Sequence, residues 1–311
     1  MSEQHPVMLV TSSLCDFFTP KKEFQSSYYE NFIAQYSEIT VSAIVSQGNL
    51  DENMFKEPPD FLDNHIDEFI NDITKSAMKL RKIFSSASII LGCDHGELIQ
   101  KYEERTFATE HFVQKSNKLK IRNRIHVLRT LNANAFFSYF SLFESTIEDI
   151  YNEMFPNSKS KVMGGILVEH CLKEILKYKE IEISFSKDIC QRSKFFLNMD
   201  ILRSSWAFLN FIRNRQVHDN NKYDEKSKLE LEKLYKKISQ DILIIKKTED
   251  LNDIFKMNFG HIIAQVKDDG FLVFNNTLEN FVRNTTLFIM ESLYICELEK
   301  SNLMRDNDGE Q

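Results

Sequence analysis

Two short segments each bring an arginine and a histidine close together along the chain. In FIRNRQVHDN, Arg213 and His218 have four residues between them. In IRNRIHVL, Arg122 and His126 have three. A histidine exchanges protons near neutral pH, and an arginine binds phosphate through two parallel N–H groups. Together they supply proton transfer and a cation for charge that develops on phosphoryl oxygens, which is what RNA cleavage without a metal requires.

The residues around Arg213 allow this chemistry, but they also allow a purely structural role. Asn214 can orient reacting groups or bind phosphate as a neutral donor, and Arg215 can add a more exposed phosphate contact. In the structural interpretation, Arg213 pairs with a carboxylate such as Glu144 on a neighbouring helix. His218 then only ends its helix, where an imidazolium interacts favourably with the dipole. Residue types alone leave both interpretations open.

The IRNRIHVL segment differs from FIRNRQVHDN in its spacing and its surroundings. Arg122 and His126 lie on one face of a helix, and no apolar lead-in or turn accompanies them. The window 111–130 holds six lysines and arginines and no acidic residue: Lys115, Lys118, Lys120, Arg122, Arg124 and Arg129. It is either a solvated helix face paired with acidic neighbours or an RNA-guiding surface that includes Lys120, Arg122 and Arg124.

Helices must position these groups, because apolar residues recur at intervals of three and four along most of the chain. The pattern predicts helices at about 24–45, 60–91, 163–178, 200–218, 224–247 and 276–298. In the helix 200–218, the expected buried residues are Leu202, Trp206, Leu209 and Ile212. The strongest stripe consists of Phe136, Phe140, Phe143, Ile147, Ile150 and Met154.

Breaks in the pattern set the expected boundaries. Neither Gly nor Pro occurs from Glu97 to Phe155, a span of roughly 90 Å as one helix. We therefore expect a break at TLNANA, residues 130–135, where asparagines can cap or turn the chain. The segment HIIAQVKDDGFLVF, residues 261–274, has two short β-branched or aromatic runs around Asp-Gly, which is the usual signal of a β-hairpin.

The expected fold is mainly α, a helical bundle with a small β-hairpin near the C-terminus and an N-terminal helical region. Residues 1–129 form that N-terminal region, which is regulatory or RNA-guiding. Residues 130–300 form the helical domain that carries Arg213 and His218, and residues 301–311 form a disordered tail.

Composition excludes several classes of protein. The net charge of -7 argues against a protein that mainly coats nucleic acid. No run approaches the roughly 18 apolar residues of a membrane span, and no basic flank precedes a long apolar stretch at the N-terminus, so we expect a cytoplasmic protein without membrane contact. The five cysteines are scattered and contain no C-x-x-C pair. Because Cys93–Glu97 and the pair His170-Cys171 lack zinc-site spacing, we expect neither a metal nor a cofactor.

The segment RNRQVH, from Arg213 to His218, resembles the hallmark of the HEPN superfamily of helical-bundle ribonucleases and nucleotide-binding proteins. That hallmark is an arginine, then four to six intervening residues of which the first is polar and often asparagine, and then a histidine, at the end of a bundle helix. The helix with LFESTIEDIY is similar to an early helix of the family, and Glu144 stands where that helix often carries an acidic residue. The resemblance covers roughly residues 131–298.

The resemblance implies a metal-independent endoribonuclease, similar to toxins or anti-phage defence effectors. Arg213, His218 and Asn214 are then catalytic, and Glu144 supports them. Positions five apart on a helix differ by about 140° in direction, so Arg213 and His218 of one copy do not converge on one phosphate. An isologous homodimer brings two motifs face to face and is expected here, with RNA as substrate and an antitoxin or trigger-sensing protein as a further candidate partner.

Two rival interpretations use the same residues differently. In the first, the chain is a non-catalytic HEPN dimerisation module, in which Arg213 and His218 bind RNA or a nucleotide without cleaving it. In the second, it is a purely structural helical scaffold. RNA cleavage that resists EDTA and requires both residues separates the nuclease from these rivals.

Overall fold

A computed structural model describes residues 17–20, 22, 26–50, 62–76, 108–154, 179–219, 221–245 and 248–308. Regular structure in these ranges is helical, and the β-type pairing recorded there is one isolated antiparallel bridge between Lys222 and Phe271. The fold is therefore mainly α, as predicted. None of the helices in the described ranges combines the length and the apolar character that a membrane crossing requires.

The chain divides into two compact units. Unit 1 comprises Met1–Ala43 and Asn132–Gln311, and unit 2 comprises Ile44–Leu131. Two helices, α2 (Ser27–Leu50) and α6 (Asn123–Met154), run without interruption through the two boundaries. Residues up to Ala43 thus group with the later part of the chain.

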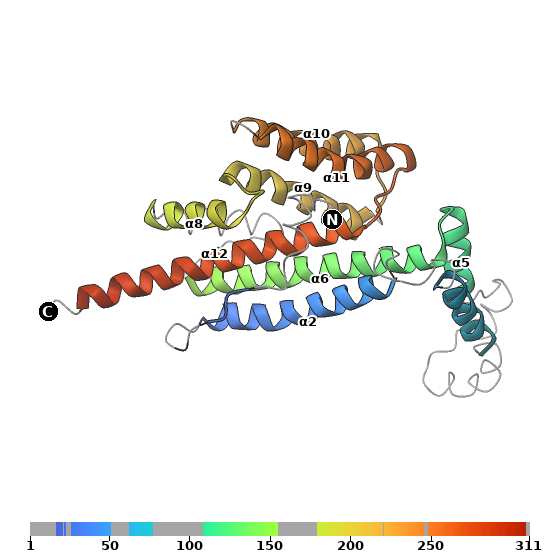
Figure 1. Cartoon of the computed structure of the whole chain (residues 1–311), viewed down its shortest axis with the longest axis horizontal. Helices are drawn as coiled ribbons and strands as arrows, with labels where there is room; N and C mark the ends of the chain where they lie inside the picture. The colour runs from blue at the N-terminus through green and yellow to red at the C-terminus, as the bar shows by residue number, and fades with distance from the viewer. Residues whose placement is uncertain are drawn as a thin grey trace, which may run out of the picture. The chain divides into compact units, whose positions relative to one another are not determined.

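Unit 1 is built around α12 (Asn276–Asp308), whose residues 281–294 are all buried. In Figure 1, α2 and α6 run along one side of α12, and α8 (Lys179–Arg192) and α9 (Met199–Asp219) lie on the other. Beyond α9 lie α10 (Glu225–Leu243) and α11 (Glu249–Asp269), which pack against each other. Unit 1 is therefore a layered helical bundle with α12 at its centre.

Aromatic rings fill the space between these layers. Phe140 on α6 stacks on Trp206 of α9 with 4.7 Å between ring centroids, and the edge contact from Phe143 to the same indole measures 5.1 Å. Tyr29 on α2 stacks on Tyr294 of α12 at 4.3 Å. Buried aromatic pairs add to area burial through their preferred geometry, so these contacts fix how neighbouring helices meet.

The central helix also carries charge inside the bundle. Glu279 and Arg283 are almost wholly buried and form an ion pair with 3.6 Å between Nε and Oε1. Nearby, the Tyr139 hydroxyl donates to Thr40 Oγ1 at 2.9 Å. Burial raises the pKa of Tyr139, and the Glu279 carboxylate raises it further. Breaking such a pair by removing one partner is costly, because it leaves a buried charge uncompensated.

Unit 2 is held together by contacts from the start of α6. Arg124 is fully buried and donates from Nε to Asp63 Oδ1 at 3.1 Å and from Nη1 to the Leu50 carbonyl. Asn123 Nδ2 donates to Asp67 Oδ1 at 2.8 Å. Both aspartates lie on the helix 62–76, so this acidic helix is fastened to the basic segment that begins α6.

A tight turn joins α5 (Ala108–Lys118) to α6. The Ile121 N–H donates to the Ser116 carbonyl at 3.1 Å and the Lys120 N–H to the Asn117 carbonyl at 3.0 Å, a Schellman-type end of helix. Lys120 has a φ of 53°, a conformation that glycine adopts more easily. A lysine therefore occupies the position where most helices of this type place glycine.

The predicted β-hairpin at 261–274 is wrong. Residues 261–269 belong to α11, and Gly270 ends that helix with a φ of 72° and an N–H bond to the Val266 carbonyl. Phe255, Phe259, Ile263 and Val266 are buried in α11 at helical spacing. The Asp-Gly pair is thus a left-handed helix end and not a hairpin turn. In the segment after it, the β-type pairing recorded among the described residues is the bridge from Phe271 to Lys222.

The predicted break at 130–135 is also wrong, because α6 is continuous through it. Asn132 neither caps nor turns the chain. It is buried, and its amide donates to Asn276 Oδ1 at 2.8 Å and to the Phe274 carbonyl at 3.4 Å. At the other end of the chain, α12 continues to Asp308, so residues 301–308 are helical where we expected a disordered tail.

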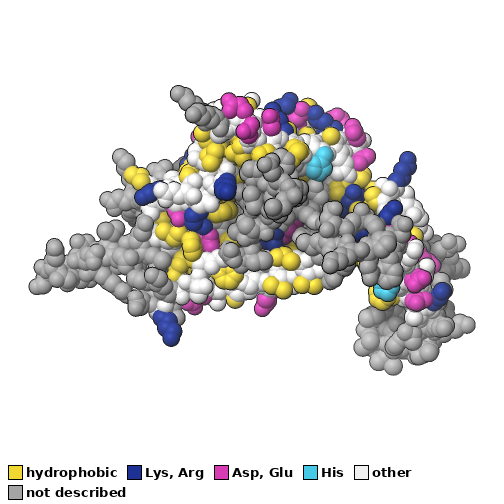
Figure 2. Space-filling view, in the orientation of Figure 1, with side chains coloured by type: hydrophobic (Ala, Val, Ile, Leu, Met, Phe, Trp, Pro, Cys, Tyr) yellow, Lys and Arg dark blue, Asp and Glu magenta, His cyan; other side chains and the backbone are white. Residues whose placement is uncertain are grey.

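The other helix predictions have mixed outcomes. Those at 24–45, 200–218, 224–247 and 276–298 are confirmed by α2, α9, α10 and α12, whereas 163–178 lies outside the described residues. The α10 face carries charges of both signs, which Figure 2 shows interspersed over α10 and α11. Lys267 Nζ, for example, lies 2.9 Å from Glu232 Oε2, which joins the two helices at the surface.

Candidate functional site

The helix α9 places the Arg213–His218 motif at its C-terminal end. The predicted inward residues Leu202, Trp206, Leu209 and Ile212 are all buried. Because Trp206 packs on α6, the following turns of α9 stay close to that helix. Arg213 is about two helical turns beyond Trp206, on the same face of α9, and therefore reaches α6 as well.

Arg213 is a restrained cation. Its Nη2 donates to Glu144 Oε2 at 2.7 Å, and its Nη1 donates to Asn214 Oδ1 at 2.9 Å. The guanidinium carbon lies 5.6 Å from the centre of the Phe140 ring, within cation–π range. About a quarter of the side chain is exposed (23%), so Arg213 is only partly shielded from solvent.

Glu144 is the anionic partner that the sequence suggested for Arg213. Only 13% of its side chain is exposed, and its Oε1 makes no hydrogen bond within the part of the chain that the structure describes. Burial raises the pKa of Glu144, whereas Arg213 lowers it and Glu148 raises it again. Arg213 therefore favours the charged form of this carboxylate against the effect of burial, and any phosphate that binds Arg213 competes with Glu144.

Asn214 connects Arg213 to the rest of the motif. Its Nδ2 is 3.5 Å from Asn210 Oδ1, at the limit of a hydrogen bond, while its Oδ1 accepts from Arg213. Residues four apart on a helix lie on one face, so Asn210, Asn214 and His218 form one row along α9. Around the axis of α9, the Asn214 side chain thus projects between the directions of the Arg213 and His218 side chains.

His218 lies in the last turn of α9 and is exposed. Within the described ranges, no side chain hydrogen-bonds to its imidazole. Arg213 and His218 are therefore not brought together in one chain: the arginine faces α6, and the histidine faces solvent. This separation agrees with the angle of about 140° expected for positions five apart on a helix.

The turn after α9 is well ordered by its own contacts. Asn221 has a φ of 61°, and its side chain pairs with the backbone of Leu272, donating at 2.7 Å and accepting at 3.1 Å. Arg215 Nη2 donates to the Lys222 carbonyl at 3.4 Å, so it helps to hold this turn. Through these contacts, residues 221–224 lead into α10.

The second arginine–histidine pair lies in unit 2 and has a structural environment. His126 is buried, its Nδ1 lies 2.7 Å from Ser116 Oγ, and its ring stacks on Phe112 at 4.1 Å. Burial lowers the pKa of His126, and Lys115 and Arg129 lower it further. A neutral histidine in this position joins α5 to α6 and is not available to a substrate.

The basic window is partly neutralised by the helix 62–76. Arg122 and Arg124 both pair with Asp63, and Arg124 has no exposed side-chain surface, so the structure does not place Arg124 on an RNA-guiding surface. This pairing matches the alternative of basic residues paired with acidic neighbours. Lys115, Lys118 and Lys120 are exposed, and no salt bridge is recorded for them in the described part of unit 2.

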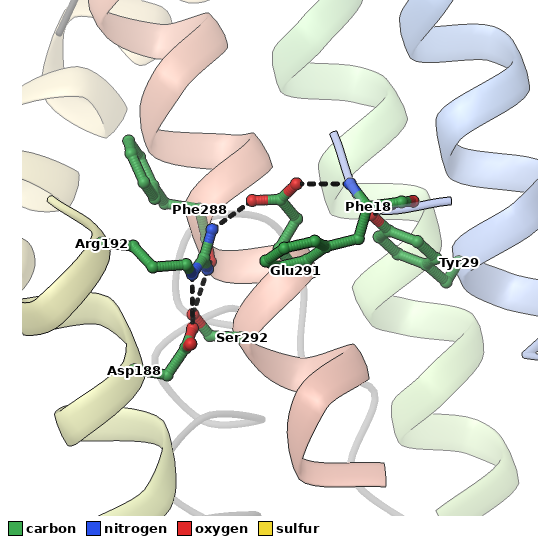
Figure 3. Close-up of polar contacts among 7 residues, drawn as sticks. All are labelled: Phe18, Tyr29, Asp188, Arg192, Phe288, Glu291 and Ser292. Atoms are coloured by element: carbon green, nitrogen blue, oxygen red, sulfur yellow. Dashed lines mark hydrogen bonds and ion pairs between the residues drawn. The ribbon is translucent and has the colours of Figure 1, made fainter. Parts of the chain in front are cut away.

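A polar cluster that the sequence did not reveal lies between α8 and α12. Arg192 and Asp188 on α8 bond with Glu291 and Ser292 on α12, and the N-terminal segment reaches the same place through Phe18 (Figure 3). A glutamate within the apolar run FIMESLYIC was the available signal, since a charge in such a run needs a buried partner.

The sequence contains only two groups that we considered as metal ligands. Across the described residues, no group of three His, Cys, Asp or Glu side chains is placed to hold a metal ion. The groups at Cys93–Glu97 and His170-Cys171 lie outside the described residues.

Comparison with known proteins gives no match: no family model, curated protein or solved structure is similar to this chain. Function must therefore be argued from the residues and contacts described above.

Proposed function

We propose that the chain is a metal-independent endoribonuclease of HEPN type, a toxin or anti-phage defence effector, that cleaves RNA at a site shared by two copies. The observation that carries this proposal is the end of α9, where Arg213 is held by Glu144 and Asn214 and an exposed His218 follows one turn later. A fixed guanidinium suits the binding of a phosphate that gains charge, because it needs little reorganisation.

In this mechanism, the groups act on one phosphodiester. His218 takes the proton from the ribose 2′-OH. The 2′-oxygen then attacks the adjacent phosphorus as the bond between phosphorus and the 5′-oxygen breaks. A water molecule donates a proton to that leaving oxygen. Arg213 stabilises the charge on the phosphoryl oxygens, and Asn214 orients Arg213 through the bond at 2.9 Å.

The same proposal gives exposed lysines of unit 2 a role in binding RNA. The guiding role proposed for Lys120, Arg122 and Arg124 is best retained for Lys120, with Lys118 added, because Arg122 and Arg124 pair with Asp63. An antitoxin or a trigger-sensing protein is part of the same proposal, as a partner that restrains the nuclease.

A second candidate is a non-catalytic module that dimerises and binds RNA or a nucleotide through the same residues. It is favoured by the surroundings of His218, for which the described residues offer no hydrogen-bond partner to orient the ring, as a catalytic base usually has. In this case, Arg213 and Asn214 bind phosphate, and His218 is a surface residue.

The two candidates are separated by incubating the purified full chain with total RNA in EDTA. The nuclease predicts cleavage that is lost in Arg213→Ala and in His218→Ala. Arg203→Ala and His111→Ala are matched controls, because both change exposed residues of the same types outside the motif. RNA binding without cleavage supports the second candidate, and cleavage that survives both motif substitutions overturns the first.

A further inference from the structure

The N-terminal segment 17–20 is fastened to unit 1 through the backbone of one residue, Phe18. The Phe18 N–H donates to Glu291 Oε1 at 3.0 Å, and the Phe18 carbonyl accepts from the Tyr29 hydroxyl at 3.0 Å. Figure 3 shows the Glu291 carboxylate on α12 between this backbone and Arg192. The segment is therefore attached to the central helix by a carboxylate that also serves α8.

The other oxygen of Glu291 accepts from Arg192 Nη1. The same guanidinium donates from Nε to Asp188 Oδ2 at 2.8 Å and from Nη2 to Ser292 Oγ at 2.8 Å. Ser292 Oγ in turn donates to Asp188 Oδ2 at 2.7 Å. The polar part of the contact between α8 and α12 is thus one closed network of ion pairs and hydrogen bonds, in which each member has its partners.

Phe18 takes part in this network with its ring as well. The Arg192 guanidinium lies 5.1 Å from the Phe18 ring and 5.2 Å from the Phe288 ring, both within cation–π range. The Phe18 side chain is 39% exposed, whereas its neighbour Phe17 is the one that packs against the hydrophobic core. Phe18 is therefore held by polar and cation–π contacts more than by burial.

Loss of Phe18 from this position would affect α8 directly. One buried oxygen of Glu291 and the Tyr29 hydroxyl would lose their partner, and Arg192 would lose one ring. A buried polar group without a partner is strongly unfavourable, so the network would have to rearrange. Burial already raises the pKa of Glu291, and the Phe18 N–H is among the contacts that lower it.

We propose that residues 17–20 are a latch that holds α8 against α12 through Phe18 and Glu291. Release of the N-terminal segment loosens α8 and leaves the remaining helices of unit 1 in place. This inference does not rest on the proposed ribonuclease function, since neither Arg213 nor His218 takes part in the network.

Hydrogen exchange measured by mass spectrometry on the full chain tests the latch. Phe18→Ala keeps the backbone bonds to Glu291 and Tyr29 and removes the ring that contacts Arg192. We expect exchange of the α8 amides to become about fivefold faster in this variant, the effect of losing one cation–π contact. The amides of α10 and α11 should keep their rates. Phe17→Ala is the matched control, because it removes a neighbouring ring that packs on the core and has no contact with Arg192 among those described.

A second, milder variant tests the latch with a smaller change to the protein. Tyr29→Phe removes only the hydroxyl that donates to the Phe18 carbonyl and keeps the ring that stacks on Tyr294. It should accelerate α8 exchange in the same direction as Phe18→Ala, by a smaller factor. Unchanged α8 exchange in both variants overturns the proposal, and so does an equal acceleration in Phe17→Ala and Phe18→Ala, which would indicate ordinary packing.

Discussion

At the scale of single residues, the most informative group is the carboxylate that pairs with Arg213. Glu144 competes with any phosphate for this guanidinium, and burial has already raised its pKa. We therefore expect Glu144→Gln to bind short single-stranded RNA about tenfold more tightly, since a charge-assisted hydrogen bond no longer has to be exchanged. Fluorescence anisotropy with labelled RNA measures the change.

The control for this prediction lies one turn away on the same helix. Glu148 is exposed, so Glu148→Gln changes the net charge by the same amount without touching the Arg213 contact. If both variants gain affinity equally, the effect is general electrostatics and Glu144 has no specific role at the site.

His126 gives a prediction about pH. Its folded-state pKa is lowered, first by burial and then by Lys115 and Arg129. Its neutral form therefore contributes stability that is present above the ordinary histidine pKa of about 6.5 and is lost as the pH falls through the lowered value. We expect α5 amides to exchange faster at about pH 5.5 than at pH 7.5, after correction for the intrinsic rate.

Two substitutions separate this effect from other titrations. His126→Gln can keep a hydrogen bond to Ser116 and cannot take up a proton, so its α5 protection should depend less on pH. His111→Gln removes an exposed histidine of the same helix and should behave as the wild type. A wild-type α5 whose protection is equal at both pH values would contradict the assignment.

At the scale of elements, the turn between α5 and α6 contains a testable strain. Lys120 adopts a left-handed conformation that costs a non-glycine residue roughly 1 kcal/mol. Lys120→Gly should therefore stabilise the α5–α6 turn by about that amount, while it removes a lysine proposed to guide RNA. The free energy of local opening from hydrogen exchange measures the first effect, and RNA affinity measures the second.

The comparison with Lys120→Ala distinguishes backbone strain from charge. Alanine removes the same charge but keeps a Cβ in the left-handed conformation, so no stabilisation is expected. Equal stability changes in the two variants would show that the lysine charge, and not the backbone, is responsible.

The elements also show which features the sequence could reveal. The inward face of α9 follows from local apolar spacing, and its four predicted residues are buried. The Asp-Gly at the end of α11 is a local signal that fits both a hairpin turn and a helix end. The apolar stripe that marks this segment as a helix begins at Phe255, before the segment 261–274. Asn132 was misread for another reason, because its partners are 142 and 144 residues away.

For the candidate site too, some residues could be predicted from nearby sequence, whereas others depend on residues far apart in the chain. The motif on α9 and its Glu144 partner were accessible, because helix periodicity and the need of a half-buried arginine for an anion pointed to them. The network of Arg192 and Glu291 was not, since its members are 99 residues apart and no local spacing connects them.

At the scale of the whole molecule, the position of the motif depends on the bundle as much as on α9. The helix α12 is buried on every side from residue 281 to 294 and separates the layer of α2 and α6 from that of α8 and α9. Arg213 and Trp206 connect α9 to α6 at the side of this central helix. The bundle therefore holds the Arg213 side chain against α6 and leaves the His218 side chain exposed. A site that contains both groups would thus need a second copy of the chain.

This arrangement makes a prediction for mixtures of inactive variants. If each proposed site combines Arg213 of one copy with His218 of the other, a mixed dimer of Arg213→Ala and His218→Ala contains one complete site. With random pairing, half of the dimers are mixed, and each has one of two sites, so about a quarter of the wild-type cleavage rate should return. Subunit exchange at micromolar concentration, followed by cleavage of total RNA in EDTA, measures it.

The control is each variant mixed with itself. It should remain inactive, because every site in it lacks the same group. Analytical ultracentrifugation of the same samples establishes that dimers form. Dimers whose mixtures stay inactive would exclude a site built from the Arg213 of one copy and the His218 of the other. A wild-type monomer that cleaves RNA would exclude the shared site altogether, because Arg213 and His218 face different directions on α9 within one chain.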